Sequence, residues 1–344
     1  MIHGERSIPA SPPRQGRQQR STSAIHRGLA ACSLILIALA LPAHAQTYPS
    51  RPLKLVVPYA PAGSVDLVGR LLAQGLSVVL GQSAVVENRA GGGGAIGAEM
   101  VAKAAPDGYT LLVAATGALT INVHLHKLSF DSERDLAPVS LLASSPLILA
   151  VKTSLPVTSV AELVNFAKAQ PGGLSFSTNG PGSLSYLSVE LLKRMTGMPI
   201  TVLSYKGGGP AATAIGAGEV DGGITDTQVI VPLIKAARAR GLAISDPMRS
   251  PTLPDLPTIA EAGVSGYSAY SWVGLFAPAG TPEAIIQRLT QATREVLARP
   301  GLNEQLHNAA MDARPSSPAE LGALVKTESA KWRDLIREAG IKGE

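Results

Sequence analysis

Short apolar runs alternate with amphipathic stretches of helix length along most of the chain. The first pair is the run Leu55-Val56-Val57 and the segment 66–80, whose leucines recur at helical spacing. This alternation is typical of α/β units, in which a buried strand precedes a helix that packs on the sheet. It predicts strands at 55–57, 84–87, 110–115, 174–177, 201–204, 222–224 and 271–277, and helices at 66–80, 97–104, 159–170, 183–196, 210–217, 229–239, 282–298 and 318–339.

The order of these elements predicts an α/β protein of two lobes. A second series of strands and helices begins after the apolar run 147–151, and the proline-rich segment 247–257 leads back toward the strand at 271–277. The simplest architecture places residues 46–150 and 270–344 in one lobe and residues 151–269 in the other. A ligand cleft is then expected between the two lobes.

Residues 1–45 have the three parts of a secretory signal peptide. Arginines precede the nearly apolar run 29–41, and Ala43-His44-Ala45 has the small-x-small form that signal peptidase cleaves. Cys32 could complete a lipoprotein box, but it lies near the start of the apolar run, whereas a lipidated cysteine follows its end. We therefore expect general secretion, cleavage after Ala45 and a periplasmic location.

The net charge of +5 comes mostly from this leader, which carries five Arg and one Glu. The remaining chain is near neutral, without a basic block and with few aromatic residues, so neither nucleic acid nor an anionic membrane is an expected partner. The single cysteine, Cys32, also lies in the leader. Disulfides and thiolate metal sites are therefore excluded from the mature chain.

Several short loops rich in Gly, Ser, Thr or Asn lie between a strand end and a helix start. Ligands of open α/β sheets bind at such places, because the helix start offers unpaired N–H groups and the positive end of its dipole. One such loop could be only a tight turn, but four together favour a cleft that binds carboxylate. The residues expected to line it are Tyr59, Ala60, Pro61, Ala62, Gly63, Ser64, Asp66, Thr116, Gly117, Ser177, Asn179, Gly182, Ser183, Lys206, Gly207 and Asp226.

Three charged residues in or near these loops each have two roles open to them. Asp66, at the start of a predicted helix, can cap that helix or can point into the cleft and accept a hydrogen bond from a ligand amine or hydroxyl. Asp226, which follows the predicted strand 222–224, has the same two roles open. Lys206 can pair with a distal carboxylate of the ligand or can remain solvated.

The sequence offers little for catalysis or for cofactor binding. Residues 92–97 have dinucleotide-binding spacing, but four consecutive glycines produce that match cheaply, and the strand at 110–115 ends without the acidic residue that a ribose needs. A phosphate loop and a Gly-x-Ser-x-Gly elbow are absent. His124 and His126 have no further cluster of metal ligands beside them, so neither a cofactor nor a metal is expected.

A series of short motifs runs through the mature chain. They are Tyr48-Pro49-Ser50-Arg51-Pro52, Val56-Val57-Pro58-Tyr59, Gly63-Ser64-Val65-Asp66, Glu87-Asn88-Arg89-Ala90-Gly91, Ala104-Ala105-Pro106-Asp107-Gly108-Tyr109-Thr110-Leu111, Tyr205-Lys206-Gly207, Gly218-Glu219-Val220-Asp221, Leu253-Pro254-Asp255-Leu256-Pro257-Thr258, Glu261-Ala262-Gly263, and Trp272 with Gly274-Leu275-Phe276-Ala277-Pro278. With these motifs the chain resembles, over essentially its whole mature length, the tripartite tricarboxylate transporter substrate-binding proteins, also called the Bug family.

The resemblance implies a type II periplasmic binding protein fold, whose two α/β lobes close on a ligand held by backbone N–H groups and water. It also implies a carboxylate ligand: a dicarboxylate, a tricarboxylate, an acidic amino acid or an aromatic acid. Asp66 matches the acidic residue that meets a ligand amine in some members. Three departures indicate a slightly different pocket: Ala62 stands for a usual glycine, Tyr186 for a common histidine, and Gly208-Gly209 for residues that are often alanine.

We therefore expect a monomeric, non-enzymatic receptor that closes on a small carboxylate and presents it to a membrane permease of the tripartite tricarboxylate type. One alternative is a sensor that docks on the periplasmic ectodomain of a signalling receptor. A second alternative is an enzyme of the same build, for which Asp66 is the candidate acid or base.

Overall fold

The first sheet is built around the buried strand that the sequence predicts at 55–57. The computed structural model describes residues 1–2 and 48–342, and this part of the chain contains a six-stranded sheet of order β11-β4-β10-β3-β1-β2. Strand β1 runs parallel to β2 and β3, whereas β10 lies antiparallel to β3 and β4. The strands are β1 (Leu53–Val57), β2 (Ala84–Asn88), β3 (Thr110–Ala115), β4 (Leu136–Ser145), β10 (Ser271–Pro278) and β11 (Asp312–Ala313).

Helices cover both faces of this sheet. Leu55 packs in a hydrophobic cluster with α2 and α9, and the next residue, Val56, packs on the opposite face in a cluster with α3. Gly75 lets α2 and α9 approach closely, because a Cβ atom there would lie 2.3 Å from Val296 Cγ1. The helical elements are α2 (Ser64–Leu80), η1 (Gly92–Gly94), α3 (Ala95–Ala102), η2 (Gly117–Ile121), α4 (Asn122–Leu125), α9 (Glu283–Leu297) and α10 (Pro300–Asn308).

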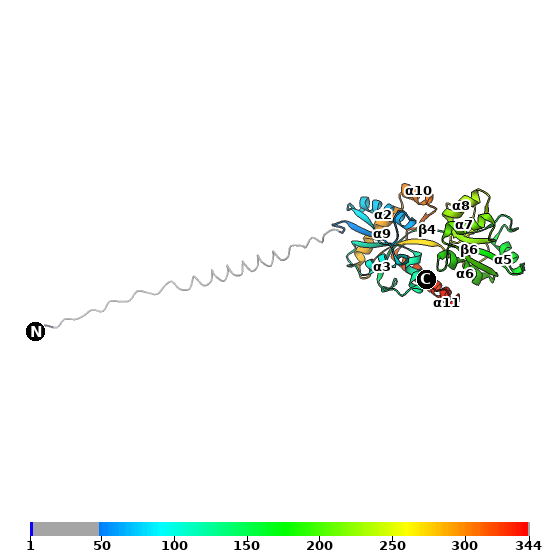
Figure 1. The fold of residues 1–344 in the computed structure, drawn as a ribbon. Coiled ribbons are helices and arrows are strands. Elements are labelled where there is room, and N and C mark those ends of the chain that lie inside the picture. Colours follow the sequence, from blue (N-terminus) through cyan, green and yellow to red (C-terminus); the bar gives the residue numbers. More distant parts are fainter. Residues whose placement is uncertain (3–47, 343–344) are drawn as a thin grey trace. The chain divides into compact units, whose positions relative to one another are not determined.

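The second sheet found in the described residues has five strands, in the order β7-β6-β8-β5-β9. Strands β7, β6 and β8 run parallel, and β5 lies antiparallel to β8 and β9. Figure 1 shows α5 to α8 gathered around this sheet, apart from α2, α3 and α9. The elements are β5 (Leu147–Lys152), α5 (Val160–Ala169), β6 (Leu174–Thr178), α6 (Leu184–Thr196), β7 (Ile200–Ser204), α7 (Gly208–Ala217), β8 (Gly222–Asp226), α8 (Thr227–Lys235) and β9 (Ala239–Ile244).

The two sheets with their helices confirm the predicted α/β fold of two lobes. We call the part built on the six-stranded sheet the first lobe and the part built on the five-stranded sheet the second lobe. The residue bounds predicted for the lobes remain a prediction.

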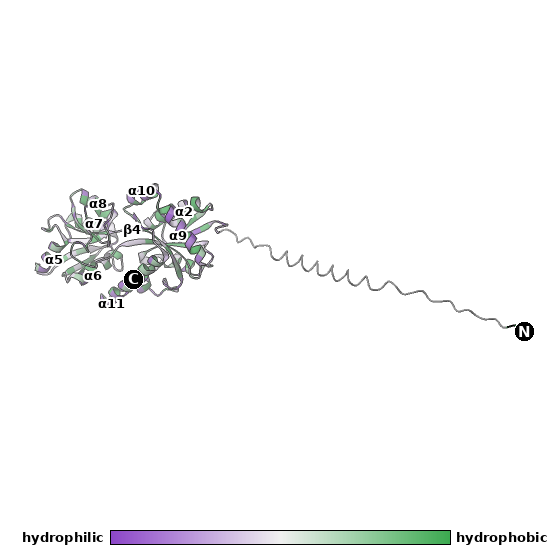
Figure 2. Ribbon diagram, turned by 180° about the vertical axis from the view of Figure 1, so that it is seen from behind, coloured by the Kyte–Doolittle hydropathy of each residue, from purple (hydrophilic) through white to green (hydrophobic). Residues whose placement is uncertain are grey.

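Local sequence signals set where several helices begin and end. The hydroxyl of Ser183 accepts a hydrogen bond from the first turn of α6, which ends at Gly197 with a left-handed φ of 67°. Helix α11 (Pro318–Glu338) begins with a capping box between Ser317 and Glu320. Hydrophilic and hydrophobic residues are both present on α2, α9 and α11 in Figure 2, as expected for helices with one face in a core.

Three segments of the described chain connect the lobes. Strand β4 leads through Pro146 into β5, and residues 245–270 lead from β9 back to β10. Helix α11 is the third connection, because its two halves belong to different hydrophobic clusters. Its first half contributes Leu321 and Val325 to a first-lobe cluster, and its second half contributes Trp332, Leu335 and Ile336 to the cluster of the second lobe.

Several elements differ from the sequence prediction, which lacks η2, α4, α10 and β11, and two further cases show the physical reason. The predicted helix at 229–239 ends early, since α8 stops at Lys235 and residues from Ala239 onward form β9. Pairing of β9 with β5 outweighs the helix preference of the alanine-rich residues 236–239, which follow α8. Strand β4, which the sequence does not predict, lies between β10 and β11.

The predicted signal peptide, its cleavage after Ala45 and Cys32 lie outside the described residues. Within those that are described, we find no helix with both the length and the apolar character needed to cross a bilayer.

Candidate functional site

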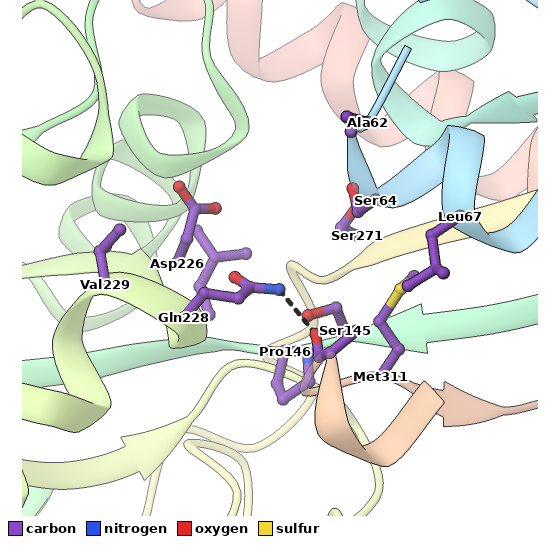
Figure 3. Close-up of a pocket in the computed structure, with 13 residues that line it drawn as sticks. Ala62, Ser64, Leu67, Ser145, Pro146, Asp226, Gln228, Val229, Ser271 and Met311 are labelled. Atoms are coloured by element: carbon purple, nitrogen blue, oxygen red, sulfur yellow. Dashed lines mark hydrogen bonds between the residues drawn. The ribbon is translucent and has the colours of Figure 1, made fainter. Parts of the chain in front are cut away.

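A pocket of about 520 Å³ lies where the β1–α2 loop of the first lobe faces the β8–α8 loop of the second. Figure 3 shows Ala62 and Ser64 on one side of this pocket and Asp226 on the other. The residues that line it are Ala62, Gly63, Ser64, Leu67, Ser145, Pro146, Leu147, Asp226, Gln228, Val229, Ser271, Ala309 and Met311.

The first lobe presents the start of α2 to this pocket. Gly63 is the N-cap residue, and no side chain caps the helix there. The first N–H group bonded within the helix is that of Leu67, which donates to Gly63 O at 3.0 Å. The N–H groups of residues 64 to 66 therefore have no acceptor inside the helix, and together with the dipole of 17 aligned residues they favour negative charge at this point.

Asp66 braces the loop that leads into α2. Its Oδ2 accepts hydrogen bonds from the Ala62 N–H at 2.9 Å and from Arg70 Nε at 2.8 Å, and its Oδ1 accepts from Asn88 Nδ2 at 2.9 Å. Asn88 Nδ2 also donates to the carbonyl of Tyr59 at 3.1 Å. We call Asp66, Arg70 and Asn88 the loop brace, because they fix the loop at both of its ends.

Burial and hydrogen bonding act in opposite directions on Asp66. Burial of the carboxyl, which is 2% exposed, raises its pKa. The hydrogen bonds from Arg70, Asn88 and Ala62, with the charge of Arg70, outweigh burial and hold the pKa of Asp66 below its usual value. All these donors belong to the protein and Asp66 does not line the pocket, so its contact with a ligand remains a prediction.

The second lobe places Asp226 in the pocket at the end of β8. Asp226 Oδ2 accepts a hydrogen bond from Asn179 Nδ2 at 2.8 Å, and the other end of that amide, Asn179 Oδ1, accepts from Thr225 Oγ1 at 3.2 Å. Burial raises the pKa of Asp226, and the bond from Asn179 offsets part of that rise. Asp226 is the one lining residue with an ionisable side chain.

Two further hydrogen bonds tie the start of α8 to segments outside the second sheet. Thr227 Oγ1 donates to the carbonyl of Pro146 at 2.6 Å, at the crossing between the lobes. Gln228 Nε2 donates to the carbonyl of Ala309 at 3.1 Å, which is the bond drawn in Figure 3. The β8–α8 loop is therefore positioned by both lobes.

Several other predicted site residues support the surrounding loops. Thr116 Oγ1 accepts from the Trp272 N–H at 2.9 Å, and Ser177 Oγ donates to the carbonyl of Ala211 at 2.9 Å. Lys206 is exposed. The structure brings Ala62, Gly63, Ser64 and Asp226 together around the pocket. The predicted residues that do not line it, and whose contact with a ligand remains a prediction, are Tyr59, Ala60, Pro61, Asp66, Thr116, Gly117, Ser177, Asn179, Gly182, Ser183, Lys206 and Gly207.

Sequence reasoning missed the pocket residues that come from distant parts of the chain. Ser145 lies at the end of β4, Ser271 begins β10, and Ala309 follows α10. None of them belongs to a glycine-rich loop, so no local pattern indicates them. Gln228 could have been predicted as a pocket residue, because it lies two residues after Asp226, between the predicted strand 222–224 and the predicted helix 229–239.

The pocket is suited to holding an anionic group. A positive helix start on one side faces a single carboxylate on the other, and no lining residue is a histidine, cysteine or lysine. Among residues 1–2 and 48–342 no group of three or more His, Cys, Asp and Glu could hold a metal ion.

Comparison with known proteins places the chain in a family. The family model described as "Tripartite tricarboxylate transporter family receptor" matches residues 68–341. The chain belongs to this family. The receptor is 37% identical to BugT of Bordetella pertussis over 308 residues, which are 88% of this chain and 94% of BugT.

Two solved structures agree with this family and with its fold. The R. palustris protein Rpa4515, solved with adipate, is 37% identical, has a TM-score of 0.68, and is covered over 100% of its length by 86% of the receptor. MatC from Rhodopseudomonas palustris, solved with bound malate, is 34% identical with a TM-score of 0.63, covering 84% of the receptor and 100% of MatC. The predicted Bug-family membership and two-lobed periplasmic binding fold are confirmed.

Ala62 gives a first test of the pocket loop in this receptor. Its φ of 67° is left-handed, which costs an L-residue about 1 kcal/mol. Ala62→Gly removes this strain, but the greater conformational entropy of glycine stabilises the unfolded chain by about 0.4–1 kcal/mol. The two effects nearly cancel, so we expect a free energy of unfolding within about 0.5 kcal/mol of the parent in urea denaturation. Ala60→Gly, in the same loop without a positive φ, should lose the entropy term alone. Equal losses in both variants would show that Ala62 is not left-handed in solution.

Proposed function

We propose that this receptor captures a small organic carboxylate in the pocket between Gly63 and Asp226 and presents it to a membrane transporter of the tripartite tricarboxylate type. The observation that carries the proposal is the uncapped start of α2 in a pocket whose lining includes no Lys or Arg. A carboxylate bound there is held by backbone N–H groups and the helix dipole. The adipate and malate in the two related structures support this ligand class.

The size and position of the pocket fit a small ligand that both lobes contact. A volume of about 520 Å³ falls in the range of roughly 300–1,000 Å³ for small-molecule sites. A ligand that contacts Ser64 of the first lobe and Asp226 of the second lobe binds most tightly when the lobes are closest. Its binding therefore favours a closed form, which a transporter can distinguish from the empty receptor.

The location of the receptor, its oligomeric state and its need for a cofactor are part of the proposed function. We propose that residues 1–45 are removed on export, and that the receptor acts in the periplasm as a monomer without cofactor or turnover. Membership in a transporter receptor family supports delivery to a permease over docking on a sensor ectodomain.

Thermal unfolding tests this proposal. The protein is the chain from residue 46 onward, which includes the whole compact unit Tyr48–Glu344, freed of any ligand that co-purifies. Ligand at 100 times its dissociation constant should add about 2.7 kcal/mol to the free energy of unfolding, so one group of mono-, di- or tricarboxylates should raise the melting temperature. The uncharged amides of the same acids, with every carboxylate replaced, are the control and should give no shift. If no carboxylate stabilises the protein, the proposed function is wrong.

A further inference from the structure

One pocket group is unfavourable for a plain carboxylate ligand. When ionised, Asp226 carries the same charge as such a ligand, and it lies across the pocket from the start of α2, on the opposite side from Ala62 and Ser64 (Figure 3). Two carboxylates close together repel each other unless a hydrogen-bond donor lies between them or one is protonated. A pocket built for an unsubstituted acid would therefore gain from an uncharged residue at this position.

Asp226 is held in place by groups that do not use its full hydrogen-bonding capacity. Although it occupies the N-cap position of α8, its side chain makes no capping bond, so the usual structural role of such an aspartate is absent. The amide of Asn179 bonds to Oδ2, and the described residues offer no second side-chain hydrogen bond to the carboxylate. The backbone N–H of Asp226 itself also bonds to the carboxylate. Because an ionised carboxylate has about four acceptor positions, it can still accept from a donor of a molecule in the pocket.

The neighbours of Asp226 fix the direction of this carboxylate. Thr225 Oγ1 bonds to Asn179 Oδ1, so the amide must present its NH₂ group to Asp226. Asn179 N–H in turn donates to Ser185 Oγ at 3.3 Å. Gly208 leaves the space that the carboxylate occupies, since a Cβ atom there would lie 2.7 Å from Asp226 Oδ2. These contacts hold the Asp226 carboxylate in one orientation.

We infer that Asp226 accepts a hydrogen bond from a hydroxyl or ammonium group of the ligand, so that this receptor selects carboxylates that carry such a group over unsubstituted acids of the same length. The inference rests on the proposed function, because it assumes that a ligand carboxylate lies at the start of α2. The two sides of the pocket then read two different parts of one molecule: the helix start binds the anionic end, and Asp226 binds the donor.

Dissociation constants for matched acids test the inference by titration calorimetry. The sets differ in one group: succinate, malate and aspartate; glutarate, 2-hydroxyglutarate and glutamate; adipate and 2-aminoadipate. In the set that binds, the parent should hold a hydroxy or amino acid about tenfold or more tighter than the plain acid, the effect of one hydrogen bond to a charged group. In Asp226→Asn this preference should fall below about threefold, and the plain acid should bind as tightly as before or more tightly, since the repulsion is gone.

A control variant and the unmodified receptor make the result decisive. Asp255→Asn removes one negative charge from an exposed position outside the pocket and should leave every dissociation constant unchanged. The comparison within the parent protein does not depend on any variant folding. If the plain acid binds the parent as tightly as its hydroxy and amino partners, or if Asp226→Asn weakens all members of a set equally, the inference is wrong and the proposed function stands. If no acid of any set binds, both are wrong.

Discussion

Glu328→Ala is expected to lower the free energy of unfolding by about 3–4 kcal/mol, because it strands a largely buried cation. Glu328 is 3% exposed in α11, where it forms an ion pair with Lys331 and accepts from Trp332 Nε1 at 2.9 Å. Lys331 Nζ also donates to Ser268 O at 2.6 Å, but that carbonyl cannot neutralise its charge. The loss should lie toward the lower end of the range for buried pairs, since the Lys331 side chain is 21% exposed and partly reaches water. Urea denaturation measures it.

Two further variants separate a stranded charge from a lost contact. Glu338→Ala, in the same helix, breaks an exposed pair with Arg194 and should cost about 0–1 kcal/mol. The double variant Glu328→Met with Lys331→Met removes both charges and should recover most of the stability lost by Glu328→Ala. A loss below about 1 kcal/mol for Glu328→Ala alone would mean that this pair is not buried in solution.

Asp66→Ala is expected to weaken both the fold and the binding of every ligand. It removes the acceptor for Ala62, Arg70 and Asn88. Ala62 and Arg70 are exposed and can bond to water instead, so we expect a loss of about 2 kcal/mol in the free energy of unfolding. The loop before α2 is then no longer fixed. Binding must order this loop at a cost in free energy, so ligand affinity should fall about tenfold. Urea denaturation of the empty protein and titration calorimetry measure the two effects.

The choice of ligand distinguishes a brace from a direct contact. If Asp66 acts as a brace, plain, hydroxy and amino acids should weaken by the same factor, and stability should fall without ligand. If Asp66 contacts an amine, amino acids alone should weaken and the empty protein should keep its stability. Arg70→Ala removes one donor of the brace and should reproduce part of the stability loss.

The brace also sets a dependence on pH. The pKa of Asp66 is lower in the folded protein than the value of about 3.9 in an unfolded chain. The brace therefore contributes its full stability above about pH 4 and loses it as the pH falls through the lower folded pKa. Between neutral pH and pH 3 the parent should lose more stability than Asp66→Ala, and parallel curves for the two proteins would contradict this account.

Buried strands and helix ends could be predicted from the sequence, because short-range patterns determine them. The run 55–57 becomes a buried strand and Ser183 and Gly197 bound α6 because apolar runs and capping residues act within a few positions. Strands β4 and β9 depend on partners far along the chain. Their segments contain Pro, Ser and Ala, which do not favour strands, and long-range pairing decides their conformation.

The residues of the candidate site also fall into two groups, those that a local pattern indicates and those that only the folded structure brings together. Gly63 and Asp226 follow strands and could be found from the α/β pattern alone. Ser271 and Met311 reach the pocket from segments that are adjacent to it only in space. Asp66 was ambiguous because the residue that explains it, Asn88, lies 22 positions later on β2.

The position of α11 in both lobes also affects the order in which the chain can fold. The second-lobe cluster contains Trp332, Leu335 and Ile336, and the first sheet has β10 at its centre, so each lobe needs residues from the last quarter of the chain. Neither lobe can complete its core while these residues are still being synthesised. Completion of either lobe is thereby delayed until nearly the whole chain has left the ribosome, although the second lobe is built mostly from the middle of the sequence.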